Sequence, residues 1–347
     1  MALGPSRSPG MARQEISAEG SEVSANIRIP ADFEPHARTI LAWAIHREWG
    51  GDRERVEREL ERVVRAIAED EPVTLLVPPD LVGAARLRSF GPEVEVVSAP
   101  VDDVWMRDIA PVFAKRGGDT VAIDLNFNGW DGSRNVRPGD RLARTHDFGV
   151  PVVGVPFVGE GGAFITDGAG LAVATRSCLF SRNPHLDEAA ITRSFGRIGI
   201  HTVLWLDGDR REPITTGHPD GYMAFLPDRS LLVEAAGRGH GRRTRGRDLA
   251  VLRQAVEEGR LRALRPFGRP RESCFEVASA QFAGTYLNFF VTRNSVLTAR
   301  FGDEHEDPRA ESQLREFFPD REIRMLDINA ILRGGGGIRC LTQPMPS

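Results

Sequence analysis

Residues 53–77 read RERVERELERVVRAIAEDEPVTLLV, an amphipathic segment followed by a short apolar run. Apolar residues recur at helical spacing from Val56 to Ile67, with Arg and Glu between them. This pattern predicts a helix over Arg53–Asp70 with one buried face. The apolar run Val73–Val77 ends at two prolines and predicts a short buried strand. A helix joined closely to a buried strand is typical of α/β and α+β proteins.

The same alternation continues along the chain. Short runs of apolar and β-branched residues predict further strands at Val94–Val97, Val121–Phe127, Val152–Val158, Leu171–Thr175, Thr202–Leu206, Ser230–Glu234, Tyr286–Val291 and Ser295–Thr298. Helical spacing predicts helices at Asp187–Gly196, Asp248–Glu258 and Pro308–Phe317. Because no break in composition marks a linker, we expect one domain over residues 25–347. Residues 1–24 are rich in Ser, Gly, Ala and Pro, so we expect a disordered leader there.

Composition excludes several classes of protein. The 347 residues are 41% hydrophobic and 27% charged with a net charge of −4, which gives no reason to expect binding to nucleic acid or to an anionic membrane. No apolar run approaches the roughly 20 residues that a bilayer requires. The three cysteines, Cys178, Cys274 and Cys340, lie far apart and form no CxxC pair. This spacing argues against a disulfide framework and a structural zinc site, and it favours a reducing cytosol.

Two candidate functional segments follow expected strands. DVWMRD, at Asp103–Asp108, comes soon after Val94–Val97, and Glu160-Gly161-Gly162 comes directly after Val152–Val158. Loops at strand ends often carry function, and glycines let the backbone approach a ligand closely. Taken alone, each segment fits a structural role better, as a helix cap or salt bridge for Asp108 and as a plain turn for the glycines.

Two further segments place polar side chains on turns. His218 and Asp220 are two residues apart, so on an extended segment their side chains would share a face. A histidine beside a carboxylate is a candidate acid/base pair, although a lone dyad is more often a structural hydrogen bond. The segment NFNGW, at 126–130, could place Asn128 and Trp130 at a pocket, or Trp130 could simply cover an edge of the core.

The fifth segment is Gly334-Gly-Gly-Gly-Ile-Arg-Cys340. Four consecutive glycines carry a cost in conformational entropy, so we expect the chain there to pass close to a ligand and to present Cys340. Cysteines are more often buried and inert than reactive. Because Cys178 and Cys274 lie in ordinary apolar surroundings, Cys340 is the better candidate nucleophile.

Together these segments supply carboxylates, a histidine and a cysteine, a set that suits a guanidinium substrate. A guanidinium is a planar cation whose N–H donors match carboxylates in forked geometry. Flanking carboxylates would keep it protonated, so its carbon would stay electrophilic, and the bound cation would favour ionisation of a nearby thiol. A histidine could then protonate the departing ammonia and activate water.

With these motifs in order, the chain resembles the agmatine deiminases and the bacterial-type peptidylarginine deiminases of the guanidine-modifying superfamily, from about Pro30 to Pro346. The carriers of the resemblance are PADFEPHARTILAW (30–43), DVWMRD (103–108), NFNGWDG (126–132), EGG (160–162), CLFSRNPH (178–185), GHPDG (217–221), YLNFFV (286–291), RFGD (300–303) and GGGGIRCLTQPMP (334–346). The resemblance implies a pentein fold, an α/β propeller of five ββαβ blades around a central active site.

The resemblance also implies roles. Cys340 would be the nucleophile that forms a covalent amidino intermediate, and His218 the general acid/base. Asp108 and Asp220 would clamp the guanidinium, and Glu160 would lie near its second nitrogen and the histidine. The substrate-binding residues that it implies are Trp105, Arg107, Asn128, Trp130 and Gly337. No metal or organic cofactor is expected. We expect a homodimer in the cytoplasm.

The chain departs from the agmatine deiminase pattern in ways that leave the substrate open. The family usually reads GGGNIHC, NAWGG and TEEC where this chain has Gly334–Cys340, Asn128–Gly132 and Thr175–Cys178. Arg339 could repel a second cationic group or accept a carboxylate, and Asp131 could hold an amine. We expect agmatine, giving N-carbamoylputrescine and ammonia. Free arginine, peptidyl-arginine, another guanidino compound, amidino transfer to an amine and a non-catalytic binding module remain alternatives.

Overall fold

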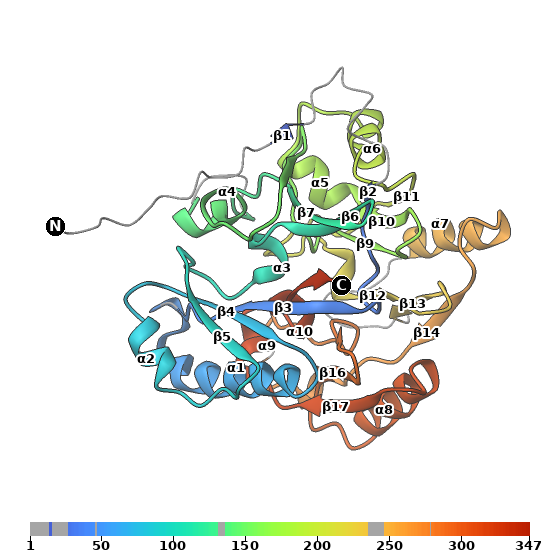
Figure 1. Ribbon diagram of the computed structural model, residues 1–347. Coiled ribbons are helices and arrows are strands. Elements are labelled where there is room, and N and C mark those ends of the chain that lie inside the picture. The colour runs from blue at the N-terminus through green and yellow to red at the C-terminus, as the bar shows by residue number, and fades with distance from the viewer. Residues whose placement is uncertain (1–13, 16–26, 46, 131–135, 235–245, 278) are drawn as a thin grey trace.

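The computed structural model describes residues 14–15, 27–45, 47–130, 136–234, 246–277 and 279–347. Most of the leader expected at 1–24 and the candidate Asp131 lie outside these ranges. Within them the strands form five small mixed sheets, which are arranged around the middle of the molecule (Figure 1).

Each described sheet contains one recurring unit. Two strands pair antiparallel, and the second of them pairs in parallel with a strand that the chain reaches through helical structure. In one sheet β9 (Phe164–Thr166) and β10 (Leu171–Thr175) are antiparallel, and β10 and β11 (Thr202–Leu206) are parallel. The helices α5 (Arg176–Arg182) and α6 (Glu188–Gly196) make the crossover, as a parallel pair requires.

The other sheets follow the same plan. Two are three-stranded: β12 (Met223–Phe225), β13 (Leu231–Glu234) and β14 (Leu264–Phe267), with α7 (Gly246–Glu257) as the crossover; and β15 (Phe290–Val291), β16 (Ser295–Ala299) and β17 (Glu322–Leu326), with α8 (Glu306–Phe317). A third has the order β1 (Gln14–Glu15), β8 (Val152–Gly154), β7 (Asp119–Asp124), β6 (Val112–Arg116) and β2 (Ile27–Arg28), with α4 (Leu142–Thr145) between β7 and β8.

The last sheet joins the two ends of the chain. Its order is β18 (Gln343–Pro346), β3 (His36–Ala42), β4 (Val73–Val77) and β5 (Val94–Ser98), and its crossovers are α1 (Arg53–Ala68) and α2 (Val82–Arg86). Because β18 pairs antiparallel with β3, the segment that follows Cys340 is anchored to the N-terminal part of the domain. The short helices α3 (Met106–Ile109), α9 (Asn329–Arg333) and α10 (Ile338–Leu341) complete the set with the 3-10 turns Arg47–Asp52, Pro138–Arg141, Pro219–Gly221 and Glu272–Cys274.

The predicted amphipathic helix is confirmed as α1. Its apolar face, from Val56 to Ile67, is buried in the main hydrophobic core together with Leu75 and Leu76 of β4. Each such fully buried side chain contributes about 1.5–3 kcal/mol relative to an exposed one. Figure 1 shows α1, α2, α6, α7 and α8 at the outside of the molecule, whereas α3 and α10 lie near its centre.

Several predicted strands are confirmed and others are shorter. The bounds of β4, β10 and β11 match the prediction. The strand expected over Val121–Phe127 ends at Asp124, because Asn126 has a positive φ of 59° and its amide group donates to the carbonyl oxygens of Val155 and Phe157. Because the carbonyl groups of Val155 and Phe157 bind Asn126, the chain leaves the sheet after Gly154. The strand predicted over Val152–Val158 therefore ends at Gly154.

No helix in the described part of the chain has the length and apolar character needed to cross a membrane.

Candidate active site

Two one-turn helices bring the candidate nucleophile and a carboxylate to the centre of the molecule. Cys340 lies in α10 and Asp108 in α3, and the two helices pack against each other. The Cys340 Sγ atom lies 4.0 Å from Oδ2 of Asp220. Cys340, Asp108 and Asp220, which are far apart in the sequence, therefore meet as the sequence predicts.

The Asn288 side chain holds the turn that carries Cys340. Its Oδ1 accepts from the backbone N–H groups of Gly337 (3.1 Å) and Cys340 (3.2 Å), and its Nδ2 donates to the backbone carbonyl of Asp220 (3.1 Å). One buried amide group thus joins the cysteine turn to the His218–Asp220 segment. No role was predicted for Asn288, although it is a polar amide inside the apolar run YLNFFV.

The glycine run is required by the close approach of an aromatic ring. A Cβ atom on Gly336 would overlap the ring of Trp105, and Gly335 has a positive φ of 94°. The glycines therefore let the chain pass beside Trp105 before it enters α10. Gly334, Gly335 and Gly336 line the same pocket as Cys340, and the predicted close approach to a ligand stays a prediction.

A pocket of about 340 Å³ opens over these groups. Its lining consists of Trp105, Asp108, Trp130, Ile214, Thr215, His218, Gly334, Gly335, Gly336 and Cys340. A sulfur, an imidazole, a carboxylate and two indole rings therefore share one cavity.

Asp108 is fixed by two hydrogen bonds. Its Oδ1 accepts from the backbone N–H of Gly162 (2.9 Å) and its Oδ2 from the indole N–H of Trp130 (2.8 Å). Burial raises the pKa of Asp108, and the carboxylates of Glu160 and Asp220 add to the rise, which His218 and Trp130 oppose. A bound cation would favour the charged form of this carboxylate.

His218 is held between acidic groups. Its Nε2 lies 2.9 Å from Oε1 of Glu160, and its Nδ1 lies 3.9 Å from both Oδ2 of Asp108 and Oδ1 of Asp220. Burial would lower the pKa of His218, but Asp108, Cys178 and Glu160 outweigh it and raise the pKa well above the ordinary value. The imidazole is therefore suited to hold a proton at neutral pH.

Glu160 is in turn held by Arg182. The Arg182 Nη2 lies 2.5 Å from Oε1 and its Nε donates to Oε2 (2.9 Å). Burial would raise the pKa of Glu160, but Arg182 and His218 outweigh it and lower the pKa to about 2. Glu160 is therefore a permanent negative charge beside His218. Arg182 belongs to the CLFSRNPH motif, but no role was predicted for it.

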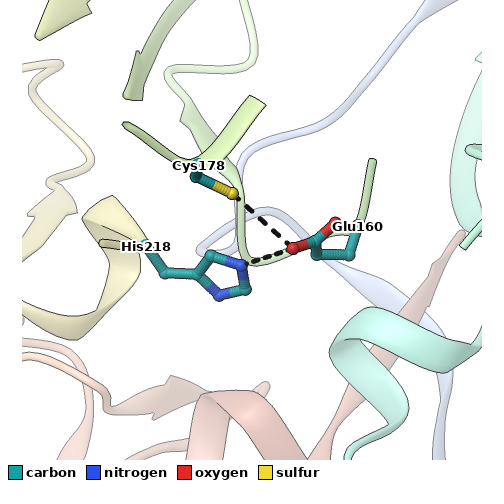
Figure 2. A group of neighbouring side chains, drawn as sticks. All are labelled: Glu160, Cys178 and His218. Carbon is teal, nitrogen blue, oxygen red and sulfur yellow. Dashed lines mark hydrogen bonds and ion pairs between the residues drawn. The ribbon is translucent and has the colours of Figure 1, made fainter. Parts of the chain in front are cut away.

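Cys178 joins this cluster through Glu160, as Figure 2 shows. Its Sγ donates to Oε1 of Glu160 at 3.6 Å, and the residue is fully buried and does not line the pocket. Burial raises the pKa of the Cys178 thiol, and Glu160 raises it further. A buried thiol with a raised pKa is a poor nucleophile, so the structure favours Cys340.

The donor atoms of Glu160, Cys178 and His218 lie within 4.8 Å of one another, a spacing that could hold a metal ion. However, both oxygens of Glu160 already bond to the buried guanidinium of Arg182. A metal cation there would be placed beside a fixed positive charge. The arrangement fits a hydrogen-bonded cluster better than a metal site.

The expected substrate-binding residues separate into two groups. Trp105 and Trp130 line the pocket with Cys340. Arg107 does not: its Nη1 binds Oδ1 of Asp32 (3.1 Å), and it lines a different cavity of about 450 Å³. Successive residues of a helix point in directions about 100° apart, and here Asp108 lines the catalytic pocket whereas Arg107 lines the other cavity.

Gly337 and Asn128 also lie outside the pocket lining. The Gly337 N–H is bound to Asn288, and the Asn128 Oδ1 is buried without a hydrogen-bond partner among the described residues. Neither position is therefore seen to contact the space in front of Cys340.

Replacing Glu160 with glutamine should move the pH dependence of catalysis. Loss of the negative charge lowers the pKa of His218, so the imidazole loses its proton at lower pH. The basic limb of the kcat/KM profile should then shift to lower pH, with about a tenfold loss of rate on that limb. Glu188→Gln is a matched control, because Glu188 pairs with Arg176 on the surface. An unshifted basic limb in Glu160→Gln would contradict the coupling.

The chain is similar to known deiminases in both sequence and structure. Residues 28–346 match the family model of the Porphyromonas-type peptidyl-arginine deiminases. The agmatine deiminase of Pseudomonas aeruginosa is 29% identical, over 92% of this chain and 95% of that protein. The structure of the Enterococcus faecalis agmatine deiminase superposes with a TM-score of 0.83 at 23% identity, over 96% of this chain and 100% of that one.

A second solved structure has the same fold. A Cys-to-Ser variant of the C. jejuni agmatine deiminase, solved with its substrate bound, superposes with a TM-score of 0.78 at 19% identity. The match covers 92% of this chain and 96% of that one.

Proposed function

We propose that this chain, which belongs to the Porphyromonas-type peptidyl-arginine deiminase family and is a hydrolase of the agmatine deiminase group, acts through Cys340. Its proposed substrate is a small guanidino compound. Agmatine is the first candidate, with N-carbamoylputrescine and ammonia as products. The observation that carries the proposal is the meeting of Cys340, His218 and Asp108 in one pocket, with Asp220 4.0 Å from the sulfur.

Substrate binding would rest on the two aspartates. Oδ1 of Asp220 is buried and has no hydrogen-bond partner among the described residues, so it is available to accept from a guanidinium N–H. Asp220 is not part of the pocket lining but lies 4.0 Å from the Cys340 sulfur, and Asp108, which does line the pocket, offers a second carboxylate. Two carboxylates around a planar cation fix its orientation and keep it protonated. The guanidinium carbon would then face the Cys340 sulfur.

The first half of the reaction forms a bond from sulfur to that carbon. As the tetrahedral intermediate collapses, the carbon–nitrogen bond breaks, and the proton held by His218 passes to the departing ammonia. The product of this half-reaction is an amidino thioether on Cys340. Glu160, held ionised by Arg182, keeps the imidazole charged until the proton is needed.

The second half releases the ureido product. Neutral His218 takes a proton from water, and the resulting hydroxide attacks the amidino carbon. The carbon–sulfur bond then breaks and Cys340 is restored as thiolate. Each step needs only groups that line the pocket or touch His218.

Three observations bear on the substrate. Trp105 and Trp130 line the pocket, and indole rings suit both an alkyl chain and a cation. The relatives named above are agmatine deiminases, and one of them has been solved with its substrate bound. Free arginine, peptidyl-arginine and other guanidino compounds use the same chemistry and are the alternatives. A non-catalytic binding module has less support, because it would need no thiol beside a protonated imidazole.

The architecture fits the same proposal. The five sheets with their recurring unit are the blades of a pentein propeller, formed by one domain over residues 25–347. The candidate active site then lies where the blades converge. A cytoplasmic enzyme and a homodimer remain part of the proposal.

The test is a ureido-product assay run in parallel on agmatine, free arginine and an arginine-containing peptide. We expect agmatine to be turned over with the highest kcat/KM, with ammonia released in equal amount. Preference for arginine or the peptide would keep the chemistry and change the substrate. Product formation only with an added amine acceptor would indicate amidino transfer, and no turnover of any guanidino compound would contradict the proposal.

A further inference from the structure

Arg339, the residue next to Cys340, points away from the catalytic pocket. It is buried, and it lines the 450 Å³ cavity on the other side together with Arg107. Its Nη1 donates to Oδ2 of Asp220 at 2.6 Å, and its Nε donates to Oδ2 of Asp32 at 2.6 Å. The side chain therefore binds the carboxylate that lies 4.0 Å from the Cys340 sulfur.

The contact with Arg339 leaves one specific oxygen of Asp220 for the substrate. Oδ2 is taken by the guanidinium of Arg339, whereas Oδ1 has no hydrogen-bond partner in the described part of the chain. The terminal torsion of an aspartate is broad, so an isolated carboxylate would rotate freely. A charge-assisted hydrogen bond is short and directional, and it fixes that rotation.

Asp32 anchors the arginine in turn. Its Oδ2 accepts from Arg339 and its Oδ1 accepts from Nη1 of Arg107 (3.1 Å). Arg107 also donates from Nε to the backbone carbonyl of Arg339 at 3.3 Å. Burial would raise the pKa of Asp32, but the two guanidiniums lower it well below the ordinary value. This second anchor prevents the Arg339 guanidinium, the same group that the substrate carries, from entering the pocket.

We propose that Arg339 is a positioning residue that aims Oδ1 of Asp220 at the substrate guanidinium, with Asp32 holding Arg339 in place. The proposal rests on the proposed function. It also assigns a role to the arginine at which this chain departs from the GGGNIHC pattern: Nη1 and Nε of Arg339 bind Asp220 and Asp32, and Arg339 is not part of the lining of the catalytic pocket.

The sign of the kinetic effect follows from the geometry. Without Arg339, the Asp220 side chain is still present beside the substrate, but its carboxylate is no longer held in one orientation. Misplacement of the substrate by about 1 Å lowers the rate of the chemical step by about 100-fold. The loss should therefore appear in kcat, with KM unchanged or lower. If Arg339 had a purely structural role, its loss would lower the fraction of active enzyme and the melting temperature, without a selective effect on kcat.

The experiment compares Arg339→Gln, Arg339→Lys and Asp32→Asn with the wild type, using the full chain and the substrate that the product assay identifies. We expect kcat to fall by about 100-fold in Arg339→Gln, with KM no higher than in the wild type. Arg339→Lys should be intermediate, because one ammonium group cannot span both carboxylates as the guanidinium does. Asp32→Asn should lose less, by about tenfold, because Asp220 keeps its partner.

Two controls separate the outcomes. Arg271→Gln removes an arginine–aspartate pair with Asp303 remote from the pocket and should keep wild-type kinetics. In an Asp220→Asn background, Arg339→Gln should add less than twofold to the loss, because its effect acts through Asp220. If Arg339→Gln does not fold, the lysine variant and Asp32→Asn carry the test.

Folded variants with wild-type kcat, or with a loss confined to KM, would overturn the proposal while an active wild type leaves the proposed function intact. A wild type that turns over no guanidino compound would remove both.

Discussion

Cys340→Ser should lose kcat by about 10⁴-fold or more while keeping the fold. A hydroxyl group is a far weaker nucleophile than a thiolate, and no other group in the pocket could replace the sulfur. The substitution is nearly isosteric, and Asn288 holds the backbone of this turn through its own amide oxygen. The melting temperature should therefore stay close to that of the wild type.

The other two cysteines are the controls for this variant. Cys274→Ser lies outside the pocket and should keep the wild-type rate. Cys178→Ser should keep most of the activity, because a serine hydroxyl can still donate to Glu160 from the same position. Loss of turnover in Cys178→Ser together with normal turnover in Cys340→Ser would exchange their roles and contradict the account.

His218→Ala should lower kcat by about 10² to 10⁴-fold. The variant removes both the proton that leaves with ammonia and the base that activates water. Because Asp108, Cys178 and Glu160 raise the pKa of His218, the wild-type enzyme should keep this proton above pH 6.5 and lose activity only as the pH rises through the raised value.

Pre-steady-state kinetics distinguish the two roles of His218. If it acts in both halves of the reaction, single-turnover formation of ammonia and of the ureido product should both slow. His185→Ala, at an exposed position, is the matched control. A wild-type kcat in His218→Ala, or a profile whose basic limb does not depend on residue 218, would exclude it as the acid and base.

Much of the fold was readable where one local signal dominates. Residues Val73–Val77 and Leu171–Thr175 are fully buried apolar runs, and their bounds were predicted correctly. The strand β18 (Gln343–Pro346) was not predicted, because it contains two prolines. The prolines are tolerated because β18 is an edge strand, where a missing N–H on the outer side costs no hydrogen bond within the sheet.

Tyr286–Val291 shows the opposite failure. The run was expected to be a strand, but only Phe290–Val291 pairs as one. Tyr286 donates to Asp307, and Asn288 is used to hold the cysteine turn. Side-chain contacts with distant residues therefore replaced the regular pairing that the apolar pattern favours.

Some features of the site could be predicted from the sequence and others could not. Residue types and motifs predicted that Cys340, His218 and Asp108 belong together. They could not reveal which neighbour faces the pocket, so Arg107 was expected beside the substrate although it lies behind the site with Asp32. The orientation of Arg339 depends on contacts more than a hundred positions away in the sequence, which no local pattern encodes.

The proposed mechanism requires the Cys340 sulfur to bond to the guanidinium carbon during turnover. The direct test is a rapid acid quench of the enzyme turning over agmatine, or the preferred substrate, followed by peptide mapping with mass spectrometry. The account predicts an amidino adduct on the peptide that contains Cys340 and none in Cys340→Ser. An adduct on Cys178, or ureido product formed while every cysteine stays unmodified, would contradict it.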